Sequence, residues 1–171
     1  MIQLLKQFLE RRRVRKIFSR VVSPAHVEDL LHGKADFRTG QLDERTLEVA
    51  IVLVGGLTPG EVAQNISRIV SLAHELNMGH DSTTGPLIVF CSGRLLAEKP
   101  NPEQRLAFVA ALRSQMDKSV RIVHGAGTGH VGLLGSSDWI CNYSFLMPNF
   151  IEALRVLVSL SDGDVREMPF N

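Results

Sequence analysis

The stretch LEVAIVLVGGLTPGE, from Leu47 to Glu61, decides the predicted fold, because it passes from a strand pattern to a helix start within a few residues. Its first part is a continuous apolar run rich in β-branched residues, which is typical of a strand buried on both faces. Thr58 can cap a helix, Pro59 fits the first turn, and Glu61 completes a capping box three residues after the threonine. The sequence therefore predicts a central strand followed at once by a helix.

Two further helix starts follow along the chain. Asn101-Pro102 repeats the pattern of cap and proline, and Asn149 with Glu152 predicts another capping box. The helix after Asn101 is expected to turn its apolar residues inward, namely Leu106, Val109, Ala110 and Leu112.

Glycines interrupt the apolar pattern in the second half of the chain. SVRIVHGAG (119–127), GHVGLLGS (129–136) and NYSFLM (142–147) are interpreted as three separate strands. The order of elements after the N-terminal region becomes β-α-β-β-α-β-β-β-α-β. Its middle is the ferredoxin-like βαββαβ unit, extended by a hairpin and one more helix. The sequence therefore predicts an α+β fold with three helices on one face of a mostly antiparallel sheet.

Composition limits the classes of function. With 19 basic and 18 acidic residues in 171, the chain lacks the basic excess expected of a nucleic-acid-binding protein. Its two cysteines, Cys91 and Cys141, show neither paired zinc-ligand spacing nor a disulfide pattern, which favours a reduced, cytoplasmic setting. No apolar run reaches the ~18 residues that a membrane-spanning helix needs.

The N-terminal region differs in character from the rest. Residues 1–33 predict a helical segment that is apolar and then strongly basic, with RRRVRK at 11–16. Such a segment can be a surface helix ending in solvated arginines, or it can lie on a membrane surface or follow a membrane span. We interpret 34–45 as a polar connector and 34–171 as the main domain.

Four stretches together resemble one known family, the catalytic domains of class III nucleotidyl cyclases. The stretches are VRKIFSRVVSPAHVEDLLHG (14–33), AIVLVGGLT (50–58), RIVHGAGTGHVGLLGS (121–136) and NYSFLMPNFIEALR (142–155). The resemblance covers about residues 14 to 168, and its strength lies in the shared order and spacing. It implies cyclic AMP or cyclic GMP formation at a dimer interface. It also implies a cyclase site in which two aspartates hold metal ions, a lysine and an acidic residue read the base, and an asparagine and an arginine bind the transition state.

This chain departs from the family at most of those positions. The resemblance places the two metal aspartates at Leu53 and Thr84, the base-reading lysine and its acidic partner at His80 and Ser144, the asparagine at Ile151, and the arginine at Arg155. Only the arginine is retained.

These changes predict a domain without cyclase activity. Leucine cannot bind a cation, and threonine offers one neutral oxygen in place of a carboxylate. Losing one group that stabilises the transition state commonly costs about 10²–10³ in rate. We therefore expect a degenerate cyclase homology domain that acts as a dimerising regulatory or signalling module. It would need no cofactor, with Mg²⁺ or Mn²⁺ relevant only to residual activity, and it would pair with itself or with a cyclase domain.

Two alternatives remain at this point. The relic cleft can serve as a sensor of a nucleotide or another anionic small molecule, gripped by Arg155 with His80. The chain can also be an active adenylate or guanylate cyclase with unorthodox metal ligands, for example Asp43, Asp81 or Asp138.

The glycine run HGAGTGHVGLLGSSDW, from His124 to Trp139, has two interpretations as well. A phosphate cradle would lead into a helix N-terminus, whereas this run leads into more strand. We therefore expect a structural hairpin whose small residues allow close backbone approach at the dimer contact. His124 and His130 share a strand face, which favours ordinary polar histidines over a metal-binding pair.

Overall fold

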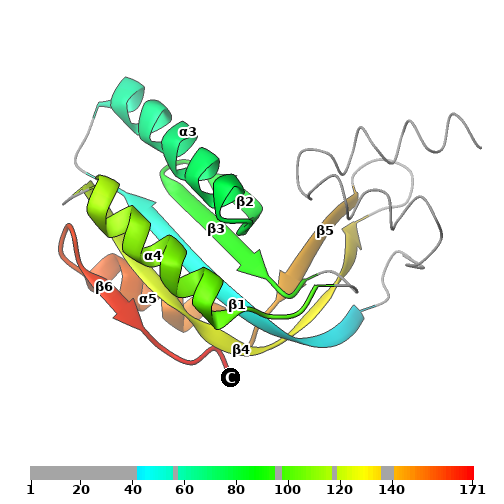
Figure 1. Ribbon diagram of the computed structural model, residues 1–171. Coiled ribbons are helices and arrows are strands. Elements are labelled where there is room, and N and C mark those ends of the chain that lie inside the picture. The colour runs from blue at the N-terminus through cyan, green and yellow to red at the C-terminus, as the bar shows by residue number, and fades with distance from the viewer. Residues whose placement is uncertain (1–41, 56–57, 95–97, 117–118, 136–140) are drawn as a thin grey trace, which may run out of the picture. The chain divides into compact units, whose positions relative to one another are not determined.

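The computed structural model describes residues 42–171, except 56–57, 95–97, 117–118 and 136–140 (Figure 1). The predicted N-terminal segment 1–33, its boundary with the main domain and its membrane contact lie outside the described residues. Within the described part of the chain, no helix has the length and apolar character needed to cross a membrane.

The described residues form one six-stranded sheet with three helices. The strands are β1 (Leu42–Val54), β2 (Gly79–Thr84), β3 (Leu87–Ser92), β4 (Val120–Gly135), β5 (Cys141–Leu146) and β6 (Val165–Glu167). The helices are α3 (Pro59–Glu75), α4 (Pro102–Met116) and α5 (Phe150–Ser159). The strand order is β2-β3-β1-β4-β5, and β6 pairs with β4. All neighbours are antiparallel except β4 and β6.

The predicted βαββαβ unit is confirmed by both connectivity and strand order. In the chain it runs from β1 through α3, β2, β3 and α4 to β4. In the sheet these strands lie side by side as β2-β3-β1-β4. The β5 strand, α5 and β6 extend this unit, so the α+β class is confirmed too.

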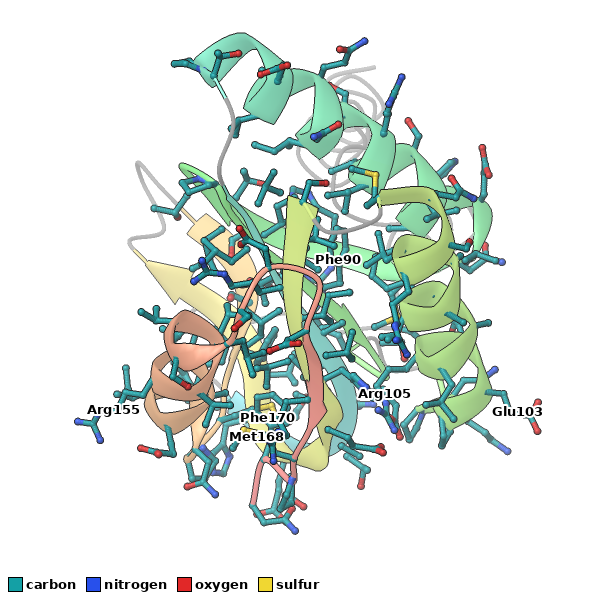
Figure 2. All side chains as sticks on the ribbon, turned by 90° about the vertical axis from the view of Figure 1, so that its left-hand side faces the viewer. Phe90, Glu103, Arg105, Arg155, Met168 and Phe170 are labelled. Atoms are coloured by element: carbon teal, nitrogen blue, oxygen red, sulfur yellow. The ribbon has the colours of Figure 1, made fainter. Side chains whose placement is uncertain are left out.

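The prediction that all three helices share one face of the sheet is wrong. Ala50 and Val52 of β1 belong to the apolar cluster that α3 and α4 cover. The alternate residues Val49 and Ile51 are also fully buried and point to the opposite face. That face is covered by α5, which contacts β1 and β4 on the side away from α4 (Figures 1 and 2). A central strand that is apolar on both faces needs a layer on each side.

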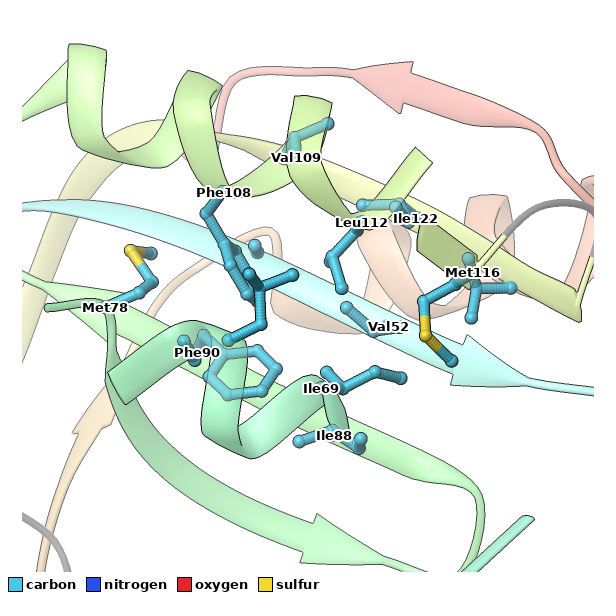
Figure 3. Packing of buried hydrophobic residues seen from close by; sticks show 14 of the residues in the cluster. Val52, Ile69, Met78, Ile88, Phe90, Phe108, Val109, Leu112, Met116 and Ile122 are labelled. Carbon is cyan, nitrogen blue, oxygen red and sulfur yellow. The ribbon is translucent and has the colours of Figure 1, made fainter. Parts of the chain in front are cut away.

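The larger core lies between the sheet and the pair α3 and α4 (Figure 3). The rings of Phe90 on β3 and Phe108 on α4 meet edge to face, with centroids 4.8 Å apart. Both side chains are fully buried. Burying an aromatic or aliphatic side chain of this size stabilises the fold by about 1.5–3 kcal/mol, so this contact is a main anchor of α4.

Two predicted strand boundaries are wrong. The two predicted strands, 119–127 and 129–136, are replaced by one continuous 16-residue strand, β4 (Val120–Gly135), which runs through the glycines. The predicted connector 34–45 overlaps β1, which begins at Leu42 and pairs with β4 along its whole length. The first residues of β1 are polar and exposed, but they still form a strand because their backbone pairs with that of β4.

The glycines of β4 make room for the C-terminal residues of the same chain. A side chain at Gly125 would meet the carbonyl oxygen of Met168, and one at Gly127 would meet the backbone of Phe170 at 2.5 Å. Phe170 is fully buried, and its amide donates to Ala126 O at 3.0 Å (Figure 2). The close approach predicted for the glycine run therefore occurs, but within one chain.

The three helix starts have different outcomes. The capping box of Thr58 and Glu61 is confirmed. Asn101 Oδ1 accepts from the amide of Gln104 at 3.1 Å, so this predicted cap is confirmed as well. The box predicted from Asn149 is wrong, because its side chain makes no cap bond and Asn149 Nδ2 donates to the carbonyl of Asn171 instead.

The predicted inward face of α4 needs correction. Leu106 is 47% exposed and Ala110 points outward, whereas Val109 and Leu112 are buried as expected. The buried positions of the helix are Arg105, Phe108, Val109, Leu112 and Met116.

Candidate functional site

The two positions that the resemblance assigns to metal-binding aspartates lie close together. Leu53 near the end of β1 is registered opposite Leu87 of β3. Thr84 at the end of β2 is registered opposite the same Leu87. Directly paired residues point to the same face, so Leu53 and Thr84 share a face with their backbones about 10 Å apart. The structure thus brings these two positions to the same face of the sheet, beside the turn between β2 and β3.

The side chains at this corner do not supply free carboxylates. Neither Leu53 nor any residue from Thr83 to Leu87 is acidic. Asp162 reaches the same region, but its Oδ1 accepts from Nε of Arg121 at 2.9 Å, which balances its charge. Within the described ranges, no group of three or more His, Cys, Asp or Glu side chains is arranged to hold a metal ion.

The two positions assigned to base recognition meet through a third residue. His80 is on β2 and Ser144 is on β5, at opposite ends of the strand order. Ser144 Oγ nevertheless donates to Asp81 Oδ1 at 3.1 Å. The Nη1 group of Arg94 also donates to this oxygen, at 2.8 Å. The side chains of Arg94 and Asp81 are only 2% and 7% exposed, so this is a buried ion pair that the serine caps.

His80 itself is half-buried beside this pair. Its Nε2 lies 2.8 Å from Thr83 Oγ1, and its ring packs on Phe90 with centroids 5.7 Å apart. Burial lowers the pKa of His80 below its ordinary value, and the negative charge of Asp81 opposes this only in part. His80 is therefore a neutral, largely apolar contact near neutral pH rather than a substitute for a lysine.

The remaining two positions, Ile151 and Arg155, lie on α5 and are exposed. Ile151 is 61% exposed. Arg155 is 74% exposed, and its Nη1 donates to Glu152 Oε2 at 3.1 Å, one turn back on the same helix. A surface ion pair of this kind contributes about 0–1 kcal/mol, so Arg155 is not fixed in place by its partner.

The strongest polar cluster of the described residues was not expected from the sequence. Arg105 on α4 is buried, and its Nε donates to Glu48 Oε2 of β1 at 2.6 Å. Its Nη2 donates to Glu167 Oε1 of β6 at 3.0 Å, and its Nη1 contacts Nδ1 of His124 on β4. One guanidinium therefore links α4 to the three strands β1, β4 and β6; Arg105 is labelled in Figure 2.

His124 takes a defined role in this cluster. Arginine can only donate, so Nδ1 of His124 must accept, which requires the neutral ring. Burial lowers the pKa of His124, the charge of Arg105 lowers it further, and Glu167 opposes both. His124 thus differs from the ordinary surface histidine that we expected.

The other candidate ligands are dispersed. His130 is exposed and six residues from His124 on the same strand, a separation of about 20 Å, so the two do not form a metal-binding pair. Asp43 is exposed near the start of β1. Asp138 lies outside the described residues.

Comparison with known proteins gives a clear result for the fold. No family model and no curated protein matches the sequence. Solved structures do match. The adenylyl cyclase CyaB from P. aeruginosa is 13% identical, with 74% of this chain and 78% of that chain covered and a TM-score of 0.64.

Two guanylyl cyclase domains agree with this match. The domain of RhGC from Catenaria anguillulae, solved in complex with GTP, is 13% identical over 73% of this chain and 79% of that chain, with a TM-score of 0.57. The dimeric domain of the RhoGC fusion protein from the aquatic fungus Blastocladiella emersonii is 14% identical over 73% and 80%, with a TM-score of 0.52. A monomeric structure of that fungal domain exists too.

These likenesses define the class of fold. The βαββαβ sheet with its added hairpin and helix is the fold of the adenylyl and guanylyl cyclase catalytic domains. This agrees with the class III nucleotidyl cyclase resemblance of the sequence, and at 12–14% identity it is a statement about fold.

Proposed function

We propose that this chain is a degenerate cyclase homology domain that lacks cyclase activity and acts as a dimerising regulatory module. The observation that supports this most is the corner at Leu53, where the cyclase fold is kept and the carboxylates are absent. Two-metal chemistry on a nucleoside triphosphate needs cations to neutralise charge on the phosphates. An aliphatic side chain cannot supply a ligand for them.

The neighbouring charges support the same conclusion. Asp162 is paired with Arg121 beside Leu53, and Asp81 is paired with Arg94 beside His80. A carboxylate already bonded to a guanidinium would have to break that pair before it could bind a metal ion. In the Asp81 pair both charges are also buried, which makes such an exchange costly.

A dimer is supported by exposed apolar side chains around α5. Leu146 at the end of β5, and Ile151 and Val158 on α5, are 50%, 61% and 67% exposed. Large exposed apolar groups concentrated on neighbouring elements are typical of a protein interface. The fungal guanylyl cyclase domain with the same fold provides a precedent, since it has been solved as a dimer.

An activity assay with the purified full chain tests the absence of turnover. ATP or GTP with Mn²⁺ should give no cyclic nucleotide above a boiled-protein control, while an active cyclase in the same buffer gives product. Steady, metal-dependent formation that is lost in Arg155→Ala would refute the proposal. Millimolar nucleotide should also leave the Tm unchanged, because a nucleotide sensor would be stabilised by its ligand.

A separate experiment tests the dimer. Light scattering should show that the full chain is dimeric and that Ile151→Asp or Val158→Asp makes it monomeric. Leu106→Asp is the matched control, because Leu106 is exposed on α4, on the other face of the sheet. A monomeric wild-type chain, or equal loss in all three variants, would contradict the assignment of this surface.

A further inference from the structure

Three glycines of β4 form a groove on the face of the sheet that α5 covers. Gly125 is registered opposite Val49 of β1, and Gly127 is registered opposite Leu47, so both point to the same face as these buried residues. Gly129 follows two residues later on the same face. We call positions 125, 127 and 129 the glycine groove, because a row of positions without side chains leaves room above the strand.

Two segments that follow β5 in the chain fill neighbouring parts of the glycine groove. The backbone of Phe170 lies 2.5 Å from the place that a Cβ of Gly127 would take. The side chain of Met147, in the connection between β5 and α5, lies 2.8 Å from the corresponding place at Gly129. Both Phe170 and Met147 are buried. The C-terminal residues and the start of α5 are therefore packed side by side on one strand.

Asn149 joins these two segments directly. It is the N-cap residue of α5, where asparagine ordinarily accepts a hydrogen bond from the helix backbone. Its side chain makes no such bond, and its Nδ2 donates instead to the carbonyl of Asn171. The amide of Phe170 donates to the carbonyl of Ala126 at 3.0 Å. The start of α5 is therefore tied through the C-terminal residues to β4.

We propose that residues 168–171 act as a strap, which holds the start of α5 against β4 and thereby orients the exposed apolar surface of Leu146 and Ile151. Leu146 is the last residue of β5, and Ile151 is the second residue of α5. The connection that the strap holds lies between them, so their relative placement depends on it. The strap rests on the contacts described above, and its effect on a dimer rests on the proposed function.

The strap gives the dimer surface two states. With the strap seated, Phe170 fills the glycine groove and Asn149 is fixed. With the strap released, the buried ring and the Asn149 bond are both lost, and α5 keeps fewer contacts with β4. A surface that is formed only in the seated state binds its partner with an affinity reduced in proportion to the seated fraction.

Asn149→Asp tests the strap with almost no change in shape. Aspartate is as good an N-cap as asparagine, but it has no N–H to donate to the Asn171 carbonyl. The amide of Ala153 donates to the carbonyl of residue 149 at 3.0 Å, so it reports on the start of α5. An effect limited to the helix would leave hydrogen exchange at Ala153 unchanged or slower. Loss of the strap should speed exchange at Ala153 and Phe170, corrected for intrinsic rates, by about twofold to tenfold, the size expected from one hydrogen bond.

Phe170→Ala is the stronger variant, because it empties the part of the groove that the strap fills. Exchange at Ala153 should be more than about tenfold faster than in the wild type. The dimer Kd, measured by light scattering over a dilution series of the full chain, should rise by at least about tenfold, and by less in Asn149→Asp. Met78→Ala is the matched control, because Met78 is buried in the core under α3 and α4. It should lower the free energy of unfolding and leave the dimer Kd unchanged.

The outcomes separate the strap from the dimer. A dimeric wild type whose Kd is unchanged in both variants would overturn the strap and keep the dimer. A monomeric wild type with faster exchange at Ala153 in both variants would contradict the proposed dimer and keep the strap. Unchanged exchange at Ala153 in both variants would overturn the strap in either oligomeric state. If Phe170→Ala does not fold, Asn149→Asp decides.

Discussion

Two polar regions of this domain are arranged in opposite ways. Around Arg105, buried charges from α4 and β1 and the exposed carboxylate of Glu167 on β6 meet a neutral histidine, and each is bonded to Arg105 or, for Arg105, to all of them. At the corner around Leu53, where the cyclase fold would place its metal ligands, the position facing the β2–β3 turn is aliphatic. Arg155, which the resemblance assigns to the transition-state arginine, is exposed and pairs with Glu152 of its own helix.

The difference shows that fold and chemistry are maintained by separate sets of residues. A leucine at position 53 offers no ligand for a cation, and its apolar side chain suits a strand that is otherwise apolar. Removing a member of the Arg105 cluster would instead leave a charge buried without a partner. The fold is kept at 12–14% identity to solved cyclase domains, and under the proposed function it is kept without the metal-binding carboxylates.

The largest expected effect is that of Arg105→Met. The change leaves Glu48, whose side chain is 3% exposed, without its cation. Breaking a buried ion pair on one side costs about 3–5 kcal/mol in the free energy of unfolding, measured by urea denaturation. Arg113→Met, at an exposed position of the same helix, is the control and should cost less than about 0.5 kcal/mol. Equal costs would show that the cluster does not hold the fold together.

The next effect contrasts two glycines. Gly127→Ala places a methyl group 2.5 Å from the backbone of Phe170, and overpacking of this kind costs about 1–3 kcal/mol. Gly60→Ala, near the start of α3, meets nothing within 4 Å and should stabilise by about 0.5–1 kcal/mol. Urea denaturation should show a lower free energy of unfolding for Gly127→Ala and a higher one for Gly60→Ala. A neutral Gly127→Ala would mean that the C-terminal residues do not need the glycine groove.

Much of the fold is predictable from the sequence because it is built from local signals. The apolar run before Thr58 and the capping box after it define β1 and α3, and both are confirmed. The glycines of β4 were assigned to a break between strands, because their spacing does not reveal that Met168 and Phe170 fill the space above them. Long-range packing of this kind leaves no local pattern.

The polar sites of the domain were also predictable only in part. Leu53 and Thr84 were chosen by resemblance, and the register brings them to one corner. The Arg105 cluster was missed, although the sequence carries a signal for it. Arg105 is in phase with Phe108, Leu112 and Met116, so an arginine stands on the apolar stripe of α4. The acid that pairs with it, Glu48, interrupts an apolar strand, and only the fold shows that the two irregularities compensate each other.

A smaller effect concerns the pH dependence of stability. The pKa values of His80 and His124 are both lowered in the folded chain, so the unfolded chain binds protons more readily just below pH 6.5. The free energy of unfolding is therefore greatest above about pH 6.5 and falls as the pH is lowered through the folded pKa values. Urea titrations at several pH values should show this slope. Combining His80→Gln with His124→Asn should reduce it, and an unchanged slope would place its origin in other groups.

The smallest effect is expected at the residue that most resembles a catalytic one. Arg155→Met removes a 3.1 Å pair between two exposed side chains, and screening by water limits its contribution to less than about 0.5 kcal/mol. The same substitution type at Arg105 should cost several times more, so urea denaturation of the two variants side by side measures the contrast between the regions directly. A loss above about 1 kcal/mol at Arg155 would exceed what an exposed pair contributes. It would mean that Arg155 has a buried partner in solution, and a dimer contact over α5 is the first place to look, because Ile151 and Val158 flank Arg155 on that helix.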